Sequence, residues 1–145
     1  MGVITDLDVR VKALANISGI SSCEYDRIDS INEDSKNSYP MLIYRVVGES
    51  NSTYRKAKSY PVLSVEFYLS DLYYQGDTAS IPEKIDGLRD QLDELIKSIG
   101  KSDNNFQLLD TATAEYGWEQ HNDDLVVVKR TASIQGFTCI TKQDQ

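Results

Sequence analysis

The chain has 145 residues, a formal net charge of −8, 40% hydrophobic residues and 26% charged residues. This composition argues against a disordered chain, and no apolar stretch approaches the roughly 20 residues that a membrane-spanning helix needs. An acidic surface repels phosphate and disfavours sequence-specific nucleic acid binding, so we expect one soluble, cytoplasmic domain over residues 1–145 that does not bind membranes.

The first predicted element is an amphipathic helix over residues 5–17. Its apolar positions recur at spacings of three and four: Ile4, Leu7, Val11 and Leu14. Thr5 and Asp8 have the spacing of a capping box, and Gly19 is placed to end the helix. The polar residues 23–38 that follow predict a partly ordered strand and loop.

Two strands and a polar connection come next. Residues 41–47 form an apolar, β-branched run that we expect Gly48 to end. The second strand alternates apolar with polar residues: Leu63, Val65, Phe67 and Leu69 against Ser64, Glu66 and Tyr68. Residues 49–59 between them predict a long, polar hairpin loop. This loop is either a solvated connection or an arm that touches a neighbouring subunit or a partner.

A long helix is predicted over residues 80–100. Ser80 and Glu83 form a capping box, and Pro82 lies in the first turn, where its missing N–H costs nothing. One face carries the apolar residues Ile85, Leu88, Leu92, Leu95, Ile96 and Ile99. The other face is charged, and its Asp90, Asp93 and Glu94 are expected to solvate it.

The last predicted elements are strands. A short edge strand over residues 106–109 and a strand over residues 112–118 precede a turn at residues 122–124. Residues 125–134 return as the final strand and pair with the one before, and the tail over residues 141–145 is expected to fray. The whole order predicts an α+β fold, in which an antiparallel sheet of about four to five strands carries two helices packed on one face.

Groups with catalytic chemistry are scarce. The single histidine, His121, lies in an acidic predicted turn that reads either as a solvated loop or as an incomplete metal site. Cys23 and Cys139 have no metal-like spacing, and we expect both to be reduced. The chain also lacks a phosphate-binding glycine loop, a nucleophile elbow and a CxxC motif. We therefore predict a protein that is not an enzyme and has no catalytic residues, no metal and no cofactor.

Several segments, taken in this order, resemble the tail terminator and tail completion (neck) family of tailed bacteriophages. The segments are residues 16–19 (NISG), residues 38–44 (SYPMLIY), residues 62–69 (VLSVEFYL), the helix over residues 81–99, and the hairpin from residues 117–119 (GWE) to residues 125–128 (LVVV). The resemblance implies a virion structural protein that forms a homo-oligomeric, hexameric ring. Such a ring lies between head and tail or caps the tail tube, and it docks to other neck or tail proteins.

The resemblance further implies that sheets of adjacent subunits meet around a lumen through which DNA passes, in a virion assembled in the host cytoplasm. An acidic lumen would let DNA slide without sticking, although the same charge would also simply keep the protein soluble. The hairpin loop would reach toward the next component. The expected partner contacts are Tyr54, Arg55, Lys56 and Lys58, with Tyr73 and Tyr74 at the subunit interface.

Two other readings remain open. A small cytoplasmic adaptor or regulatory binding module would share the order of elements but would be monomeric or dimeric. A metal-dependent hydrolase using Asp71, Asp77 or the acidic turn near His121 would bind divalent cations. Tyr73 and Tyr74 have an alternative as well, because they could fold back on the core instead of anchoring an interface.

Overall fold

The structure is a computed structural model that describes residues 2–25, 39–54, 58–72, 80–100, 106–117 and 125–136. For residues 51–54, 58–60 and 110–117 it describes the backbone alone. The predicted turn at residues 122–124 and the predicted frayed tail at residues 141–145 lie outside the described residues.

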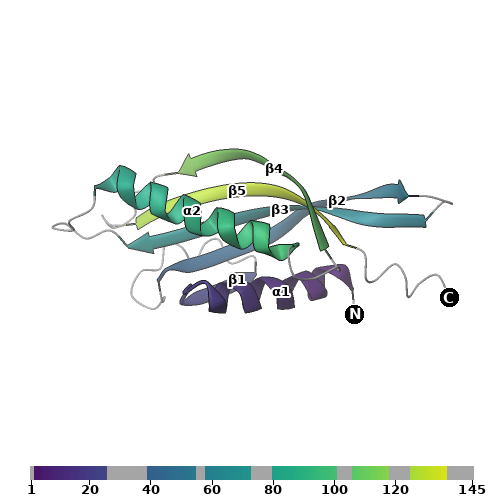
Figure 1. The fold of residues 1–145 in the computed structure, drawn as a ribbon, viewed down its shortest axis with the longest axis horizontal. Coiled ribbons are helices and arrows are strands. Elements are labelled where there is room, and N and C mark those ends of the chain that lie inside the picture. Colours follow the sequence, from purple (N-terminus) through teal and green to yellow (C-terminus); the bar gives the residue numbers. More distant parts are fainter. Residues whose placement is uncertain are drawn as a thin grey trace.

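Two helices and five strands form the described part of the chain (Figure 1). In chain order they are α1 (Val3–Ile17), β1 (Ser22–Tyr25), β2 (Met41–Tyr54), β3 (Lys58–Leu72), α2 (Ile81–Ile99), β4 (Phe106–Gly117) and β5 (Leu125–Gly136). This arrangement confirms the predicted α+β class and the pairing of the last two strands.

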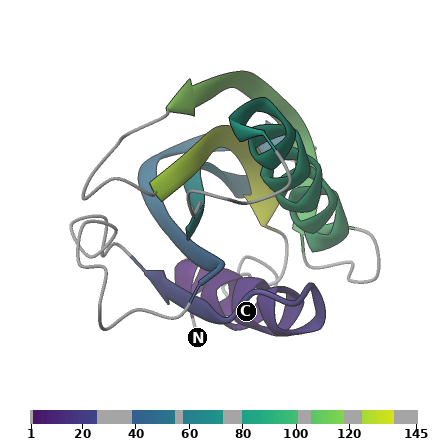
Figure 2. The same ribbon diagram turned by 90° about the vertical axis from the view of Figure 1, so that its left-hand side faces the viewer.

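The strands form one curved sheet in the order β1-β2-β3-β5-β4 (Figure 2). All neighbours are antiparallel except β1, which runs parallel to β2. The prediction of a wholly antiparallel sheet is therefore wrong at this edge. Parallel neighbours need a crossover of about a dozen residues or more, and the sequence between Tyr25 and Met41 is long enough to provide one.

One hydrophobic core joins both helices to the central strands. It contains Leu7, Val11, Leu14, Leu88, Leu92, Leu95, Ile96 and Ile99 from the helices, together with Leu42, Tyr44, Leu63, Val65, Phe67, Leu69, Val126, Val128, Ala132 and Ile134 from the strands. The strand residues alternate along the chain, as the pleat of a sheet requires. Tyr44 and Phe67 lie at the centre of this core, with stacked rings whose centroids are 6.1 Å apart.

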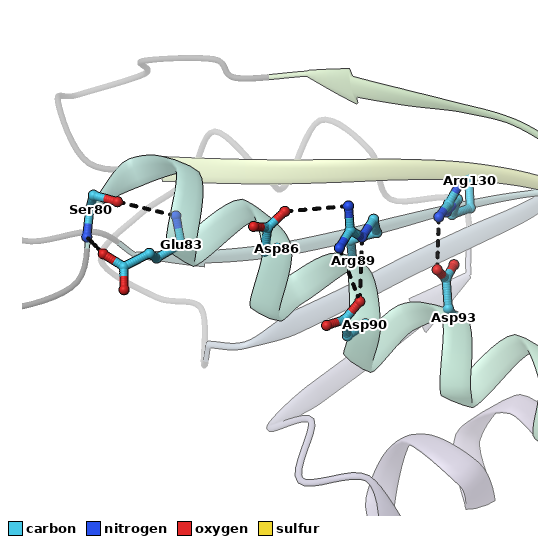
Figure 3. Close-up of polar contacts among 7 residues, drawn as sticks. All are labelled: Ser80, Glu83, Asp86, Arg89, Asp90, Asp93 and Arg130. Atoms are coloured by element: carbon cyan, nitrogen blue, oxygen red, sulfur yellow. Dashed lines mark hydrogen bonds and ion pairs between the residues drawn. The ribbon is translucent and has the colours of Figure 1, made fainter.

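The start of α2 is set by its own sequence. Ser80 Oγ accepts a hydrogen bond from the backbone N–H of Glu83, and the Glu83 carboxylate accepts one from the backbone N–H of Ser80 (Figure 3). These bonds satisfy amides that lack a partner within the helix, and they hold the pKa of Glu83 below its ordinary value. The predicted capping box is confirmed.

The capping box predicted at Thr5 and Asp8 is wrong. α1 begins at Val3, two residues earlier than expected, and its N-cap Gly2 supplies no capping side chain. Asp8 instead accepts a hydrogen bond from the Tyr44 hydroxyl of β2 and forms an ion pair with Lys12, with 3.2 Å between the charged atoms. A tertiary contact therefore replaces the local one.

The two helices cap each other near their C-terminal ends. Arg10 of α1 donates hydrogen bonds of 2.9 and 3.4 Å to the carbonyls of Ser98 and Ile99, at the end of α2. In return, Gln91 of α2 donates a hydrogen bond of 3.0 Å to the carbonyl of Ser18, at the end of α1. Carbonyls at a helix end have no partner within the helix, so these contacts fix the helices antiparallel to each other.

The strands are longer than predicted. β2 does not end at Gly48, because the pairing with β3 shifts register between Val46 and Gly48 and then continues to Tyr54. Most of the polar stretch over residues 49–59, predicted as a loop, is thus strand. β4 is likewise one strand where two were expected, and it absorbs the interruption through register shifts.

Gly136 is predicted to be intolerant of a side chain. A Cβ atom at this position would overlap with Cγ2 of Val3, at the start of α1. We expect Gly136→Ala to lower the free energy of unfolding by about 1–3 kcal/mol, because the added methyl group must displace Val3 from its place against β5. Chemical denaturation measures this loss.

Gly87→Ala is the matched control, since a Cβ at this exposed position of α2 meets nothing within 4 Å. It should stabilise the protein by about 0.5–1 kcal/mol through helix propensity. Adding Val3→Ala to Gly136→Ala should recover part of the lost stability. Equal stability of Gly136→Ala and wild type would contradict the close packing.

Candidate interaction surface

The distal part of the β2–β3 hairpin extends beyond the rest of the sheet. We call residues 49–54 of β2 and residues 58–61 of β3 the arm. β1 pairs with β2 only from Met41 to Tyr44, and β5 pairs with β3 only from Val62 to Leu72. Within the described residues, the two strands of the arm therefore pair only with each other, and they project past both helices (Figure 1).

The arm depends on the body of the sheet for its order. An isolated two-stranded hairpin is at best marginally stable in water, whereas this one continues a ladder that runs through the five-stranded sheet. Its backbone is thus presented by a rigid base. An element of this shape can reach a neighbouring molecule that the body does not touch.

The predicted partner contacts fall at the end of the arm. Tyr54 and Lys58 are paired opposite each other at its last described position, and the structure describes their backbones alone. Arg55, Lys56, Tyr73 and Tyr74 lie outside the described residues. The register therefore places Tyr54 opposite Lys58, and these two residues flank the segment that contains Arg55 and Lys56.

A charge cluster surrounds Glu66 on the sheet face opposite the main core. Its carboxylate accepts hydrogen bonds of 3.0 Å from Arg45 Nε and 3.0 Å from the Tyr68 hydroxyl, and Lys129 Nζ lies 3.2 Å from it. The Lys129 ammonium also lies 5.6 Å from the centroid of the Tyr68 ring. The cluster links β2, β3 and β5 at the base of the arm.

Glu66 is held in its charged form. Burial raises its pKa, but the hydrogen bonds from Arg45, Tyr68 and Lys129 outweigh burial and lower the pKa below the ordinary value of 4.5. For Tyr68, burial and the neighbouring Glu66 carboxylate both raise the pKa of the hydroxyl. At neutral pH the cluster therefore contains one carboxylate, two cations and a neutral phenol.

A small apolar cluster lies beside these charges on the same face. Met41, Ile43, Leu125 and Val127 are buried there, and Tyr39, Tyr68 and Leu72 pack against them. The hydroxyl of Ser70 donates to the Met41 carbonyl at 3.4 Å within this cluster. This face thus changes from apolar at the start of β2 to charged at the base of the arm.

The acidic residues of α2 have different roles (Figure 3). Asp86 and Asp90 pair with Arg89 on the exposed side of the helix, each with 3.3 Å between charged atoms. Asp93, predicted only to solvate the helix, instead accepts a hydrogen bond of 2.7 Å from Arg130 of β5. It therefore ties α2 to the sheet.

The residues considered for a metal site do not assemble one in the described part of the chain. Asp71 forms an ion pair of 2.7 Å with Lys84, while Asp77 and His121 lie outside the described residues. Among the residues that the structure covers, no group of three possible ligands converges.

Neither described helix is long and apolar enough to cross a membrane.

Cys23 has a thiol with a raised pKa. It is unpaired and partly buried, and burial, the largest effect, raises its pKa to about 12. Nearby Tyr44 also has a raised pKa, first through burial and then through its hydrogen bond to Asp8. The thiolate is the nucleophilic form of cysteine, so the raised pKa predicts a slow reaction of Cys23 at neutral pH. Cys139 lies outside the described residues.

A scan of the sequence against models of known protein families finds no match, and a search of curated protein sequences finds none either. The function is therefore inferred from the residues and the geometry of the chain itself.

The Glu66 cluster was not identified from the sequence as a site. Alternation places Glu66 and Tyr68 on the solvated side of a strand, and nothing local connects them to Arg45 or Lys129. The available signal is that charged residues interrupt these apolar strands: Arg45 in β2, Glu66 in β3, and the pair Lys129 and Arg130 in β5. Only the register, which pairs Arg45 with Glu66 and Tyr68 with Lys129, brings the four together.

Glu66→Gln should lower the free energy of unfolding by about 1–3 kcal/mol at pH 7, because it removes a charged acceptor that three groups share. A carboxylate with a lowered pKa stabilises the fold above its unfolded pKa and loses this contribution as the pH falls through its folded pKa. The difference between wild type and variant should therefore shrink below about pH 4. Denaturation curves across pH 3–7 measure this change.

Glu94→Gln is the control, because Glu94 is an exposed carboxylate on α2 with the same change in formal charge. It should leave stability within about 0.5 kcal/mol of wild type at every pH. A Glu66→Gln deficit that stays constant down to pH 3 would contradict the ionised cluster.

Cys23 is predicted to resist alkylation. In a Cys139→Ser background, where Cys23 is the remaining cysteine, iodoacetamide at pH 8 should modify the folded protein roughly a hundredfold or more slowly than the unfolded protein. The reason is the small thiolate fraction, together with the burial of sulfur. Mass spectrometry over time gives both rates, and equal rates would contradict the raised pKa.

Proposed function

We propose that this protein is a non-enzymatic virion structural protein of a tailed bacteriophage, a ring-forming tail terminator or head–tail connector. The observation that carries this proposal is the arm. Its two strands extend from a well-packed α+β body, and the sequence places basic residues at its end in a chain of net charge −8. A packed body with a projecting arm is suited to a subunit that binds a neighbouring subunit.

The mechanism proposed is stoichiometric assembly. Each subunit presents two different surfaces, and the arm of one contacts the body of the next, so the contact is heterologous and closes into a ring. The ring caps the tail tube and occupies the terminal interface, which stops further growth and offers a platform for neck proteins. The positive charge near Lys58 would draw the arm toward the acidic surface of an adjacent subunit.

The proposal extends to the setting of the ring. DNA passes through its lumen without sequence-specific contact, and the protein is found in virions after assembly in the host cytoplasm. The acidic net charge supports this part, because a lumen that attracted phosphate would hold the strand.

The solution mass tests the proposal. Light scattering behind a sizing column should give a multiple of the 16.3 kDa chain near six, and the mass should stay constant over a range of concentrations. A single chain or a dimer at all concentrations would contradict ring formation and favour an adaptor or regulatory binding module instead.

A shortened arm tests the role of that element. Replacing residues 51–61 with Asn-Gly closes the hairpin on the paired residues Ser50 and Val62, and Asn-Gly is a favoured two-residue turn. We expect a folded protein with an unchanged main core that elutes as a single chain. The matched comparison keeps the arm and replaces Arg55, Lys56 and Lys58 with Gln, which should weaken the ring most at high salt. Intact rings from both variants would contradict the proposed role of the arm.

A further inference from the structure

Two strands of the sheet have edges without a neighbour among the described residues. On one side, β1 covers β2 only as far as Tyr44, so the edge of residues 49–54 is open. On the other side, β4 is the last strand of the sheet. Gly100 lies against the backbone of Phe106 and Leu108, and the outer edge of β4 has no neighbouring strand among the described residues from Leu109 to Gly117. Open edges present a row of N–H and C=O groups that another strand can pair with.

Pro61 shows which backbone groups of the arm point outward. It lies opposite Asn51, and a proline has no N–H to donate. The pair therefore fits a non-hydrogen-bonded position of the ladder, where the N–H and C=O groups of both residues point away from the partner strand. By alternation, the backbone groups of Ser50 and Ser52 bond to β3, while those of Glu49, Asn51 and Thr53 face the open edge.

An independent contact agrees with this assignment. Val46 lies opposite Val65, and the same alternation predicts that its N–H points away from β3. Its N–H does so, because it donates a hydrogen bond of 3.1 Å to the Tyr25 hydroxyl, at the end of β1. β1 and the Tyr25 side chain thus satisfy the outward groups of β2 as far as Val46, and the open edge begins beyond this point.

The same alternation continues across the sheet to β4. By this alternation the backbone groups of Leu63 point away from β2 and toward Ile134, so the backbone groups of Ile134 point away from its other partner, Leu108 of β4. Ala132 likewise turns away from Thr111. The backbone N–H group of Thr111 therefore faces the open edge of β4, whereas that of Leu108 lies beside Gly100.

We infer that the open edge of the arm of one copy pairs, strand to strand, with the open edge of β4 of the next copy. This inference rests on the proposed ring and specifies its interface. It assigns the contact to backbone hydrogen bonds, a recognition mode in which an added strand extends an existing sheet. The sheet would then continue from one subunit into the next.

Three properties of the chain select β4 as the partner strand. β4 has a long open edge, whereas the outer edge of β1 spans only Ser22–Tyr25. β4 runs opposite to β2, so a rotation between copies can bring the two edges together antiparallel. Gln107 lies level with Ser50 in the sheet, and the arm extends away from the rest of β4, so the rotation axis of this ring is inclined to the strands. The charges also match, because β4 carries Asp110 and Glu115 while the end of the arm is basic.

Two proline variants test this pairing. Thr53→Pro removes an outward N–H of the arm, and Thr111→Pro removes an outward N–H of β4, without deleting a hydrogen bond inside the subunit. Thr53→Ala and Thr111→Ala are the matched controls, since they change the side chain and keep the N–H. Light scattering should show rings for wild type and both alanine variants, and a single chain near 16.3 kDa for each proline variant.

Mixing the two proline variants tests the direction of the contact. Thr53→Pro still offers an intact β4, and Thr111→Pro still offers an intact arm, so an equal mixture should give a two-chain species and nothing larger. Hydrogen exchange should show that the Ser50 and Ser52 amides remain protected in Thr53→Pro, which establishes that its arm is folded.

The outcomes separate the two proposals. Rings from Thr53→Pro with a folded arm, or a mixture that stays as single chains, would overturn the strand pairing and leave the ring proposal standing. A wild-type protein that is a single chain at every concentration would overturn both.

Discussion

The pairing of β2 with β3 is the interaction on which the rest of the structure depends. It runs from Met41 opposite Ser70 to Tyr54 opposite Lys58, through one register shift. β1 adds to one side of this hairpin and β5 to the other, and the helices pack on side chains that it aligns. The arm is the same ladder continued past the point where its neighbours stop, so body and arm share one register.

The two halves of this hairpin are stabilised differently. In the body, Leu42, Tyr44 and Phe67 are buried in the core, and burial of such side chains contributes about 1.5–3 kcal/mol each. The arm has polar sequence in residues 49–53 and depends on cross-strand hydrogen bonds, whose net contribution in water is small. A partner strand that excludes water from one edge would therefore stabilise the arm more than the body, because the arm has the smaller stabilisation within the subunit.

Features of the fold that are determined by residues close together in the sequence could be predicted, and features that depend on the register between strands could not. The capping box at Ser80 and the apolar stripe of α2 are local patterns, and both are confirmed. Asp8 has the spacing of a capping box as well, but Tyr44 provides a tertiary partner that no local pattern reveals. The polar residues 49–59 predict a loop because they lack hydrophobic alternation, but a strand that is paired with a neighbouring strand does not need that alternation. The parallel β1 and the cluster around Glu66 follow only from knowing which strands are neighbours.

Open edges are a hazard in any sheet, and the chain restricts them unequally. β4 has register shifts between Leu108 and Asp110 and between Ala112 and Glu115, which divide its edge into short regular runs and so limit where an added strand can pair. The edge of residues 49–54 is regular but short, because the register shift at Gly48 separates it from the rest of β2. A contact between a short regular edge and a long interrupted one is heterologous, and such a contact closes into a ring only if the rotation between subunits is fixed. The interruptions in β4 limit the registers available, and a single register is what fixes that rotation.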